Sequence, residues 1–303
     1  MIKDRSSYLF LVGKVRFLET QLFRESDLTR FLENSSEEAL INDLQNTKYG
    51  KLLSDYDFNM ALDTYIYQSW LEFKKKVEDS RILDLFMLKR DVLNFINYKK
   101  GIDAEKYYAG GVFKLNRDEE NPYLPPIFKE TEERLAKYSV DKSETIPDNL
   151  VEKVFMDIVT ENYINPLETG LIKNYWQDMV DINNLLKNVN YKKPEYYWAG
   201  GKIESSFWEK VRVSEEIPSK ISSKKYMKAV GQQSKPTEWE LKLHQYLLKY
   251  IKSMKKITFG PEAVVAFMLS LFTEVKNLNM IRAGINLGLE KKEIKANLIL
   301  GYV

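Results

Sequence analysis

The sequence predicts an all-α protein built from three copies of one helical unit. Apolar residues recur every three or four positions along most of the 303-residue chain, and sustained strand-type alternation is missing. A pattern of acid, β-branched apolar residue, any residue, Asn and large apolar residue occurs three times, beginning at Asp91, Asp181 and Glu274. Steps of 90 and 93 residues separate the three acids. This nearly constant spacing indicates an internal repeat of about 90 residues.

Four apolar stripes at helical spacing place the main helices in order. The opening helix is indicated by Tyr8, Leu11, Val15, Leu18 and Leu22, and a second long helix by Leu62, Ile66, Trp70 and Phe73. A third helix is indicated by Val151, Phe155, Ile158 and Val159. The last long helix begins near Pro261 and Glu262, because Pro suits a first turn and an acid there complements the helix dipole. Its buried seam is predicted to reach Ile285.

Polar, proline-containing segments separate the predicted repeats. The connector 116–126 carries three prolines, and residues 214–223 form a second connector. We therefore expect an N-terminal helix followed by three helical repeats, with the boundaries 1–34, 35–115, 122–205 and 210–303.

Composition excludes several classes of function. The chain is 44% hydrophobic and 30% charged, as in soluble globular proteins. Its 46 basic residues nearly balance its 44 acidic ones, so no strong field favours nucleic acid or an anionic membrane. The absence of cysteine excludes disulfides and thiol catalysis and fits a reducing compartment. The start resembles no signal peptide, and the longest apolar run, 263–272, is about half a membrane span. We expect a cytoplasmic protein without a membrane span.

The acid and the Asn of each motif copy lie three residues apart and share one helical face. Carboxylates beside amides are compatible with metal or acid–base sites. One active site would not recur three times, however, whereas one packing solution would. We therefore predict that these side chains tie down backbone in neighbouring loops, and hydrolysis by Asp91 or Asp181 remains a minor alternative. The six predicted structural residues are Asp91, Asn94, Asp181, Asn184, Glu274 and Asn277.

Paired glycines end the two similar tails YYAGG and YYWAGG. Gly110, Gly111, Gly200 and Gly201 are predicted to form sharp helix exits, because glycine adopts torsions closed to other residues. A phosphate-binding loop would need a preceding strand and a Lys-Ser or Lys-Thr pair, which neither tail has. The run 13–15 (Gly-Lys-Val) fails the same test. We expect no cofactor.

The remaining candidate residues indicate no catalytic, metal or nucleic-acid site. His244 is the only histidine, and its neighbours at helical spacing are large and apolar. The lysine pairs at 99–100 and 192–193 follow tyrosines at predicted helix ends, where cations complement the helix dipole. Solvated helix ends are therefore favoured over a nucleic-acid footprint.

The run GPEAVVAFMLSLFTEVKNLNMIRAGINLGLEKKEIKANLILGYV, residues 260–303, resembles the C-terminal signature of one subunit type of the V-type and A-type rotary ATPases. This is the C-type subunit, whose eukaryotic form is the d-type subunit. The opening is similar too, with Arg16, Glu19 and Leu22 followed by LQNTKY at 44–49. The chain departs from the family pattern at Asn279, where an Arg is usual, and before Glu274, where the family often has an acid or Lys.

This resemblance implies three related bundles arranged as a funnel with pseudo-threefold symmetry. It further implies a non-catalytic central-stalk, or rotor, protein. The chain would be a monomer within a hetero-oligomeric complex, peripheral to the inner face of the membrane. It would link the axle subunits, of D and F type, to the membrane rotor ring and transmit torque for ATP-coupled proton or sodium transport. The alternative is a cytoplasmic helical-repeat adaptor that binds a protein or peptide in a groove.

Overall fold

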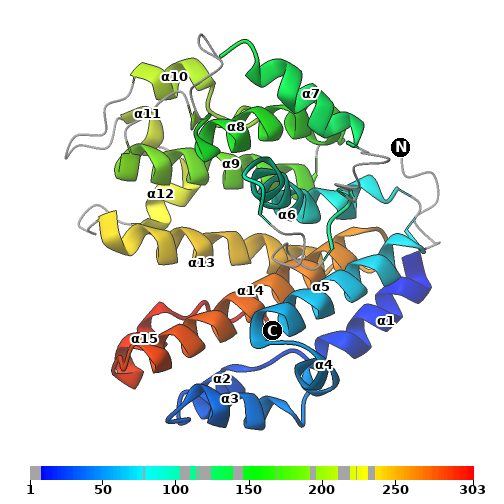
Figure 1. Ribbon diagram of the computed structural model, residues 1–303, viewed down its shortest axis with the longest axis vertical. Helices are drawn as coiled ribbons and strands as arrows, with labels where there is room; N and C mark the ends of the chain where they lie inside the picture. Colours follow the sequence, from blue (N-terminus) through cyan, green and yellow to red (C-terminus); the bar gives the residue numbers. More distant parts are fainter. Residues whose placement is uncertain are drawn as a thin grey trace. The chain divides into compact units, whose positions relative to one another are not determined.

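The structure is a computed structural model, and it describes most of the chain. The described residues are 8–77, 79–102, 110–113, 115, 124–138, 146–168, 170–191, 196–210, 219–222, 224–230 and 236–303. All regular secondary structure in these ranges is helical (Figure 1). The predicted all-α fold class is therefore confirmed.

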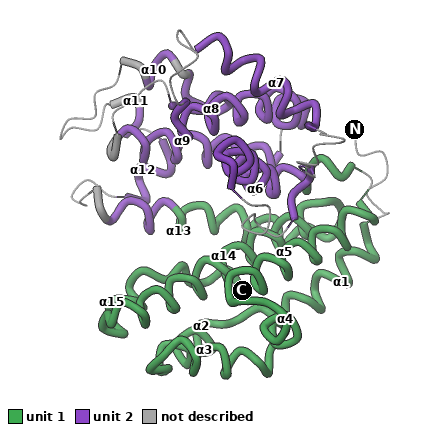
Figure 2. Tube along the Cα trace, viewed as in Figure 1, with its two compact units in different colours: residues 1–83, 244–303 green, residues 84–243 purple. Residues whose placement is uncertain are grey.

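The chain divides into two compact units (Figure 2). Unit 1 combines residues 1–83 with residues 244–303, and unit 2 comprises residues 84–243. Unit 1 is thus made from both ends of the chain, and the middle forms unit 2. The three predicted repeat boundaries and the funnel stay predictions.

Unit 1 is organised around one long buried helix, α14, which packs against five others. It contacts α1, α2, α3, α5 and α15. Aromatic packing contributes to this core, since the Phe73 ring meets the Phe267 ring edge-on with centroids 5.7 Å apart. The helices of unit 1 are α1 (Leu9–Glu19), α2 (Glu25–Phe31), α3 (Glu37–Leu44), α4 (Gly50–Asp55), α5 (Phe58–Lys74), the second part of α13 (Pro236–Lys255), α14 (Glu262–Asn286) and α15 (Lys291–Asn297).

The boundaries of α14 follow its sequence. Pro261 is the residue before the first turn, and Glu262 occupies that turn, as predicted from helix-dipole chemistry. The helix is long and apolar enough to cross a membrane by length and composition, but 72% of its most apolar window is buried inside the protein. A core helix has the same properties, and the contacts of α14 are those of a core helix.

Unit 2 is also helical, with aromatic rings at its centre. Phe128 stacks between Phe95 and Phe155, with centroids 4.7 and 5.7 Å away. Phe86 meets Trp176 edge-on at 6.0 Å. Its helices are α6 (Arg81–Lys99, which begins in unit 1), α7 (Pro126–Leu135), α8 (Asp148–Val159), the π-helical turn η3 (Thr160–Ile164), α9 (Leu171–Tyr191), α10 (Ser205–Lys210), α11 (Ser219–Ser222), α12 (Lys225–Val230) and the first part of α13.

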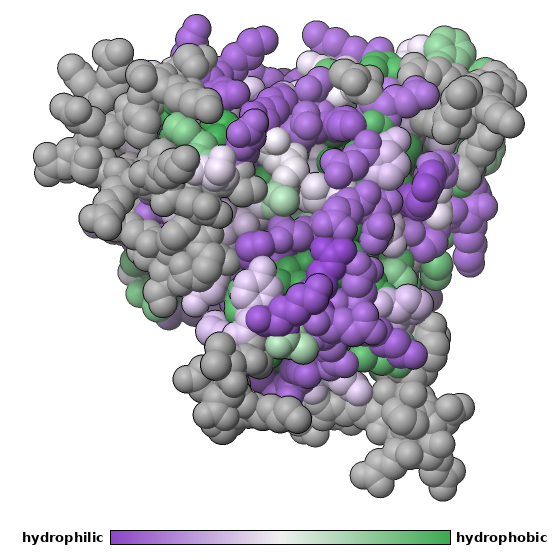
Figure 3. Space-filling view, turned by 90° about the horizontal axis from the view of Figure 1, so that it is seen from above, coloured by the Kyte–Doolittle hydropathy of each residue, from purple (hydrophilic) through white to green (hydrophobic). Residues whose placement is uncertain are grey.

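The predicted connectors are only partly visible. Most of 116–126 lies outside the described residues, and α7 begins at its last proline, Pro126. Within 214–223, residues 219–222 form the short helix α11. On the face drawn in Figure 3, hydrophilic side chains predominate among the described residues, and hydrophobic ones gather in small groups.

Candidate functional site

The first acid of the repeated motif ties the loop after α6 to the middle of that helix. Asp91 is buried, and its two carboxylate oxygens accept hydrogen bonds from the backbone N–H groups of Val112 and Phe113, each at 3.0 Å. Gly111 passes so close that an added Cβ would lie 2.3 Å from Asp91 Oδ1. Gly110 has a φ of 68°, in the left-handed region that favours glycine. The glycine pair therefore lets the backbone reach the carboxylate.

The second acid repeats this contact on α9. Asp181 is fully buried and accepts from the N–H groups of Lys202 at 3.2 Å and Ile203 at 3.1 Å. The donors lie 21 and 22 residues after the acid, as they do for the first motif copy. Gly201 approaches even more closely, because its Cβ would lie 2.0 Å from Asp181 Oδ1, and Gly200 has a φ of 91°. The two copies thus share one local structure.

The third acid makes a contact of the same kind with a different part of the chain. Glu274, fully buried in α14, accepts from the backbone N–H of Phe23 and from the Tyr49 hydroxyl, both at 2.6 Å. The Lys48 ammonium lies 2.6 Å from the same carboxylate, and its side chain is only 7% exposed. All three partners come from the N-terminal part of unit 1. The longer Glu side chain therefore joins the two chain ends that form this unit.

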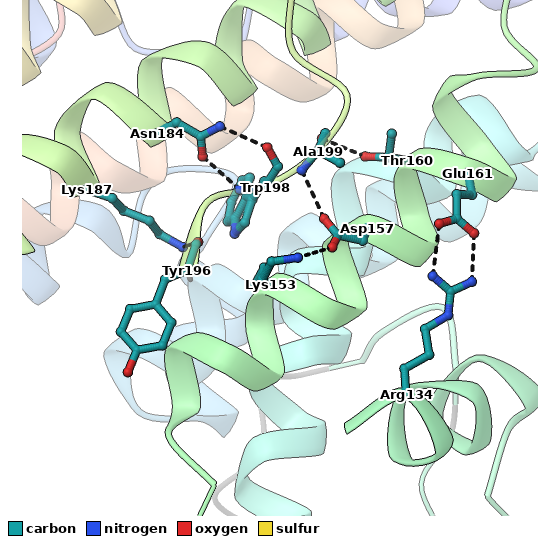
Figure 4. Close-up of polar contacts among 10 residues, drawn as sticks. All are labelled: Arg134, Lys153, Asp157, Thr160, Glu161, Asn184, Lys187, Tyr196, Trp198 and Ala199. Atoms are coloured by element: carbon teal, nitrogen blue, oxygen red, sulfur yellow. Dashed lines mark hydrogen bonds and ion pairs between the residues drawn. The ribbon is translucent and has the colours of Figure 1, made fainter. Parts of the chain in front are cut away.

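The motif asparagines hold single residues by both backbone groups. The Asn184 amide donates to the carbonyl of Trp198 at 2.9 Å and accepts from its N–H at 2.8 Å (Figure 4). Asn277 makes the same pair of bonds with Ile299, each at 2.9 Å. Asn94 is buried at the corresponding place on α6. The residue that Asn94 would hold, as Asn184 holds Trp198, falls within the segment 103–109, which lies outside the described residues.

The loop held by α9 is also bound from α8 and η3 (Figure 4). The backbone N–H of Ala199 donates to Asp157 at 2.9 Å, and the Thr160 hydroxyl donates to the Ala199 carbonyl at 3.0 Å. One residue further along, Glu161 accepts two hydrogen bonds from Arg134 of α7, at 2.9 and 2.7 Å. This bidentate pairing lowers the pKa of Glu161. Side chains from α7, α8, η3 and α9 therefore fix one another and the loop.

Burial dominates the electrostatics of Asp181. It raises the pKa of this carboxyl to about 7, although the hydrogen bonds from Ile203 and Lys202 and the charge of Lys224 act in the opposite direction. The nearby Asp178 adds to the increase in pKa, and Asp178 itself pairs with the Lys202 ammonium at 2.6 Å. Lys202 is thus held both by its backbone and by its side chain.

Burial also governs the groups around Glu274. It lowers the pKa of Lys48, and attraction to Glu274 only partly offsets that effect. It raises the pKa of Tyr49 well above its usual value, in the same direction as the neighbouring carboxylate. The pKa of Tyr65 rises to about 12 for the same two reasons. Both phenol groups are therefore neutral near pH 7, and Tyr49 donates its proton to the hydrogen bond with Glu274.

The arrangement is suited to holding backbone in place. Every carboxylate oxygen of Asp91, Asp181 and Glu274 accepts at least one hydrogen bond from within the protein. Among the described residues, no group of three or more His, Asp or Glu side chains is placed to hold a metal ion. His244 is half-buried, and its Nε2 lies 3.2 Å from the Lys276 ammonium.

The glycines predicted as helix exits lie elsewhere. Helix α6 ends at Lys99, and its exit is made by Gly101, which has a φ of 74°. The N–H of Ile102 then donates to the carbonyl of Asn97 at 3.1 Å, which closes the helix end. Gly110, Gly111, Gly200 and Gly201 lie in the loops beyond α6 and α9, where close approach to a carboxylate or a positive φ requires glycine.

One partner of Glu274 has no signal in the sequence. The backbone of Phe23 belongs to no repeated pattern, whereas Lys48 is the first residue of a Lys-Tyr pair that recurs at 137–138 and 225–226. Tyr49 does belong to a looser pattern, in which a Glu-Glu pair precedes Tyr49, Tyr138 and Tyr226. Tyr49 and Tyr226 are buried, but Tyr138 is 53% exposed, so the three tyrosines have unlike environments.

The lysines at the end of α6 form exposed ion pairs. Lys99 contacts Glu132 at 2.8 Å, and Lys100 contacts Asp148 at 2.5 Å. Both ammonium groups thus face carboxylates of unit 2 at the end of the helix. Residues 192–193 lie outside the described ranges.

The fold and these contacts define a helical scaffold with buried carboxylates that fix loops. Comparisons with known proteins place the chain in a family. The family model of the ATP synthase (C/AC39) subunit matches residues 11–297. The C-type subunit of the A-type ATP synthase of Methanocaldococcus jannaschii is 22% identical over 350 aligned positions, which cover 99% of this chain and 88% of that protein. The chain belongs to the ATP synthase (C/AC39) subunit family.

Proposed function

We propose that this protein is the non-catalytic central-stalk component of an A-type or V-type rotary ATPase. In this role it is a socket that receives the axle subunits, of D and F type, and links them to the membrane rotor ring. The observation that carries the proposal is the family match, which runs from residue 11 to residue 297. A match of this extent favours a role within the ATPase over the helical-repeat adaptor.

The contacts within the protein fit a part that carries mechanical load. A protein that transmits rotation must resist deformation, and close-packed helices have low compressibility. Loops are ordinarily the more mobile segments of a protein. Here the loops at 112–113 and 202–203 are each held by two hydrogen bonds to a buried carboxylate, and Glu274 holds Phe23 in the same manner. Load applied to these loops therefore passes directly to long helices.

The proposal assigns the chemistry of ATP and ion transport to other subunits. The motif carboxylates already accept hydrogen bonds from the protein itself, so they support no ATP hydrolysis in this scheme. The chain is a monomer within the hetero-oligomeric complex, on the cytoplasmic side of the membrane. Transport of protons or of sodium ions is compatible with this role.

Binding to the axle tests the proposal directly. The purified chain is mixed with the D-type and F-type subunits of its own source, and the mass of the eluting species is measured by light scattering. We expect one complex containing one copy of each, and no ATP hydrolysis by the chain alone. Elution of the chain as a separate monomer at micromolar concentrations of all three proteins would overturn the proposal.

A further inference from the structure

Helix α1 exposes an apolar face for which the described residues provide no cover. Its inner face buries Leu11, Val12 and Val15 against unit 1. The opposite face carries Phe10 and Phe17, which are 72% and 64% exposed and lie two helical turns apart. Full exposure of a Phe side chain forgoes about 1.5–3 kcal/mol of burial, and Phe10 and Phe17 each forgo most of that amount. Two such residues on one face of one helix indicate a contact surface.

Gly13 lies between these two rings, and the fold of the chain does not require it. Its φ is outside the left-handed region, and a Cβ added to it would meet nothing within 4 Å. A glycine inside a helix costs about 0.8–1 kcal/mol relative to alanine. The missing side chain therefore makes room for something outside the described residues. We call the surface formed by Phe10, Gly13 and Phe17 the α1 face. Gly13 leaves a shallow gap there between the two Phe side chains.

Both edges of the α1 face carry excess positive charge. On one edge, Lys14 and Lys76 share the carboxylate of Glu72, and Lys76 lies 5.7 Å from the centroid of the Phe10 ring. Burial and repulsion from Lys76 both lower the pKa of Lys14. Within the described residues, this edge thus has two cations for one carboxylate.

The other edge has the same charge balance. Arg16 and Lys255 share Glu19, at 2.7 and 3.7 Å. Burial lowers the pKa of Lys255, with attraction to Glu19 opposing the effect and repulsion from Arg16 adding to it. A partner that brings carboxylates to the two edges would balance both sets of charges.

We propose that the α1 face binds an amphipathic helix of a neighbouring protein in the assembly, which places a small apolar ridge over Gly13 and carboxylates beside Lys76 and Arg16. The inference requires only that the chain works within an assembly. It does not depend on the axle-socket role.

The shape and charge of the α1 face favour this occupant over two others. A second copy of the chain would bring one basic edge against another, which is unfavourable. A lipid surface adapts to any apolar shape and gives no reason for a glycine between two exposed rings. The backbone of a partner helix, by contrast, can approach α1 closely at Gly13, because small residues at helix contacts allow two helices to come close together.

Variants of Gly13 test the proposal through effects of opposite sign. Gly13→Ala and Gly13→Leu should keep or raise the melting temperature of the isolated chain, because both residues favour helix and the site is open. In the ATP synthase purified from the natural source and reconstituted with each variant, we expect retention of one neighbouring protein to fall by at least tenfold for Gly13→Leu and less for Gly13→Ala. Ala283→Leu adds an apolar side chain at an exposed position of α14 and is the matched control.

Cross-linking identifies the partner in the same complex. A photoreactive benzoylphenylalanine replaces Phe17, and the cross-linked peptide is sequenced by mass spectrometry. We expect one segment of a different protein of the complex, with apolar residues at helical spacing and flanking carboxylates. Three results would each overturn the proposal. The Gly13→Leu complex could retain every component as well as the parent does, the cross-links could lead to a second copy of the chain, or the isolated chain could bind phosphatidylglycerol vesicles through Phe17. Loss of axle binding alone would contradict the proposed function and leave this inference standing.

Discussion

The carboxylate of Glu274 accepts a 2.6 Å hydrogen bond from the backbone N–H of Phe23, which lies 251 residues earlier in the chain. This bond joins the C-terminal and N-terminal parts of unit 1 in a buried environment. The same carboxylate faces Lys48 and Tyr49. Glu274 therefore resembles the other two motif acids in its sequence context and in binding backbone through a buried carboxylate. Unlike them, it joins segments that are remote in the chain.

The buried pair of Glu274 and Lys48 should be strongly coupled. Glu274→Gln alone leaves the Lys48 ammonium buried without its carboxylate, and Lys48→Met alone leaves the carboxylate without its cation. Each single change should lower the free energy of unfolding by about 3–5 kcal/mol. The double variant should lose clearly less than the sum of the two, as measured by urea unfolding of all four proteins. Additive losses would show that the two charges do not interact.

The glycine that approaches Asp181 should tolerate no side chain. Gly201→Ala places a Cβ 2.0 Å from the Asp181 carboxylate, so the loop or the carboxylate must move. We expect a loss of about 1–3 kcal/mol in the free energy of unfolding, as for other overpacked sites. Gly170→Ala is the control, because a Cβ there meets nothing within 4 Å. Equal stability of the two variants would contradict the geometry.

The motif asparagine on α14 should matter far more than a neighbouring one. Asn277→Ala removes both hydrogen bonds to the backbone of Ile299 and leaves a buried N–H and a buried carbonyl without this partner. We expect a cost of about 1–3 kcal/mol for each unsatisfied group in thermal or denaturant unfolding. Asn279→Ala, at an exposed position of the same helix, should stay within about 0.5 kcal/mol of the parent. Comparable effects at both positions would argue against the motif's structural role.

The raised pKa of Asp181 predicts a specific dependence of stability on pH. The pKa is about 7 in the folded protein and about 3.9 in an unfolded chain, so the folded state binds more protons between these values. The contribution of Asp181 to stability should therefore fall as pH rises from about 4 to 7. The difference in unfolding free energy between the parent and Asp181→Asn isolates this contribution. A difference that is constant from pH 4.5 to 7.5 would be the contrary result.

Much of the fold followed from local sequence patterns, because helical periodicity and helix ends depend on nearby residues. Pro261 and Glu262 marked the start of α14 correctly. The spacing of the motif acids also indicated that Asp91 and Asp181 would bind loops. The partners of Glu274 could not be predicted in this way, since Phe23 reaches it only when the two chain ends meet in unit 1.

The glycine pairs show a second limit of local patterns. A positive φ was expected at a helix end, but Gly101 fills that place after α6. Gly111 is needed because the Asp91 carboxylate lies against it, and that contact spans an intervening loop. The exposed face of α1 was also unforeseen, since Phe10 and Phe17 stand out only once the inner face of the helix is known.

Coupled transport in a reconstituted complex tests the central claim most directly. The rotary ATPase of the natural source is assembled in vesicles with and without this chain, and ATP hydrolysis and ion uptake are measured together. We predict that omission of the chain leaves hydrolysis by the catalytic subunits but abolishes ATP-driven ion uptake, and that adding it back restores uptake. Full ion uptake without the chain would contradict its role as the link between axle and ring.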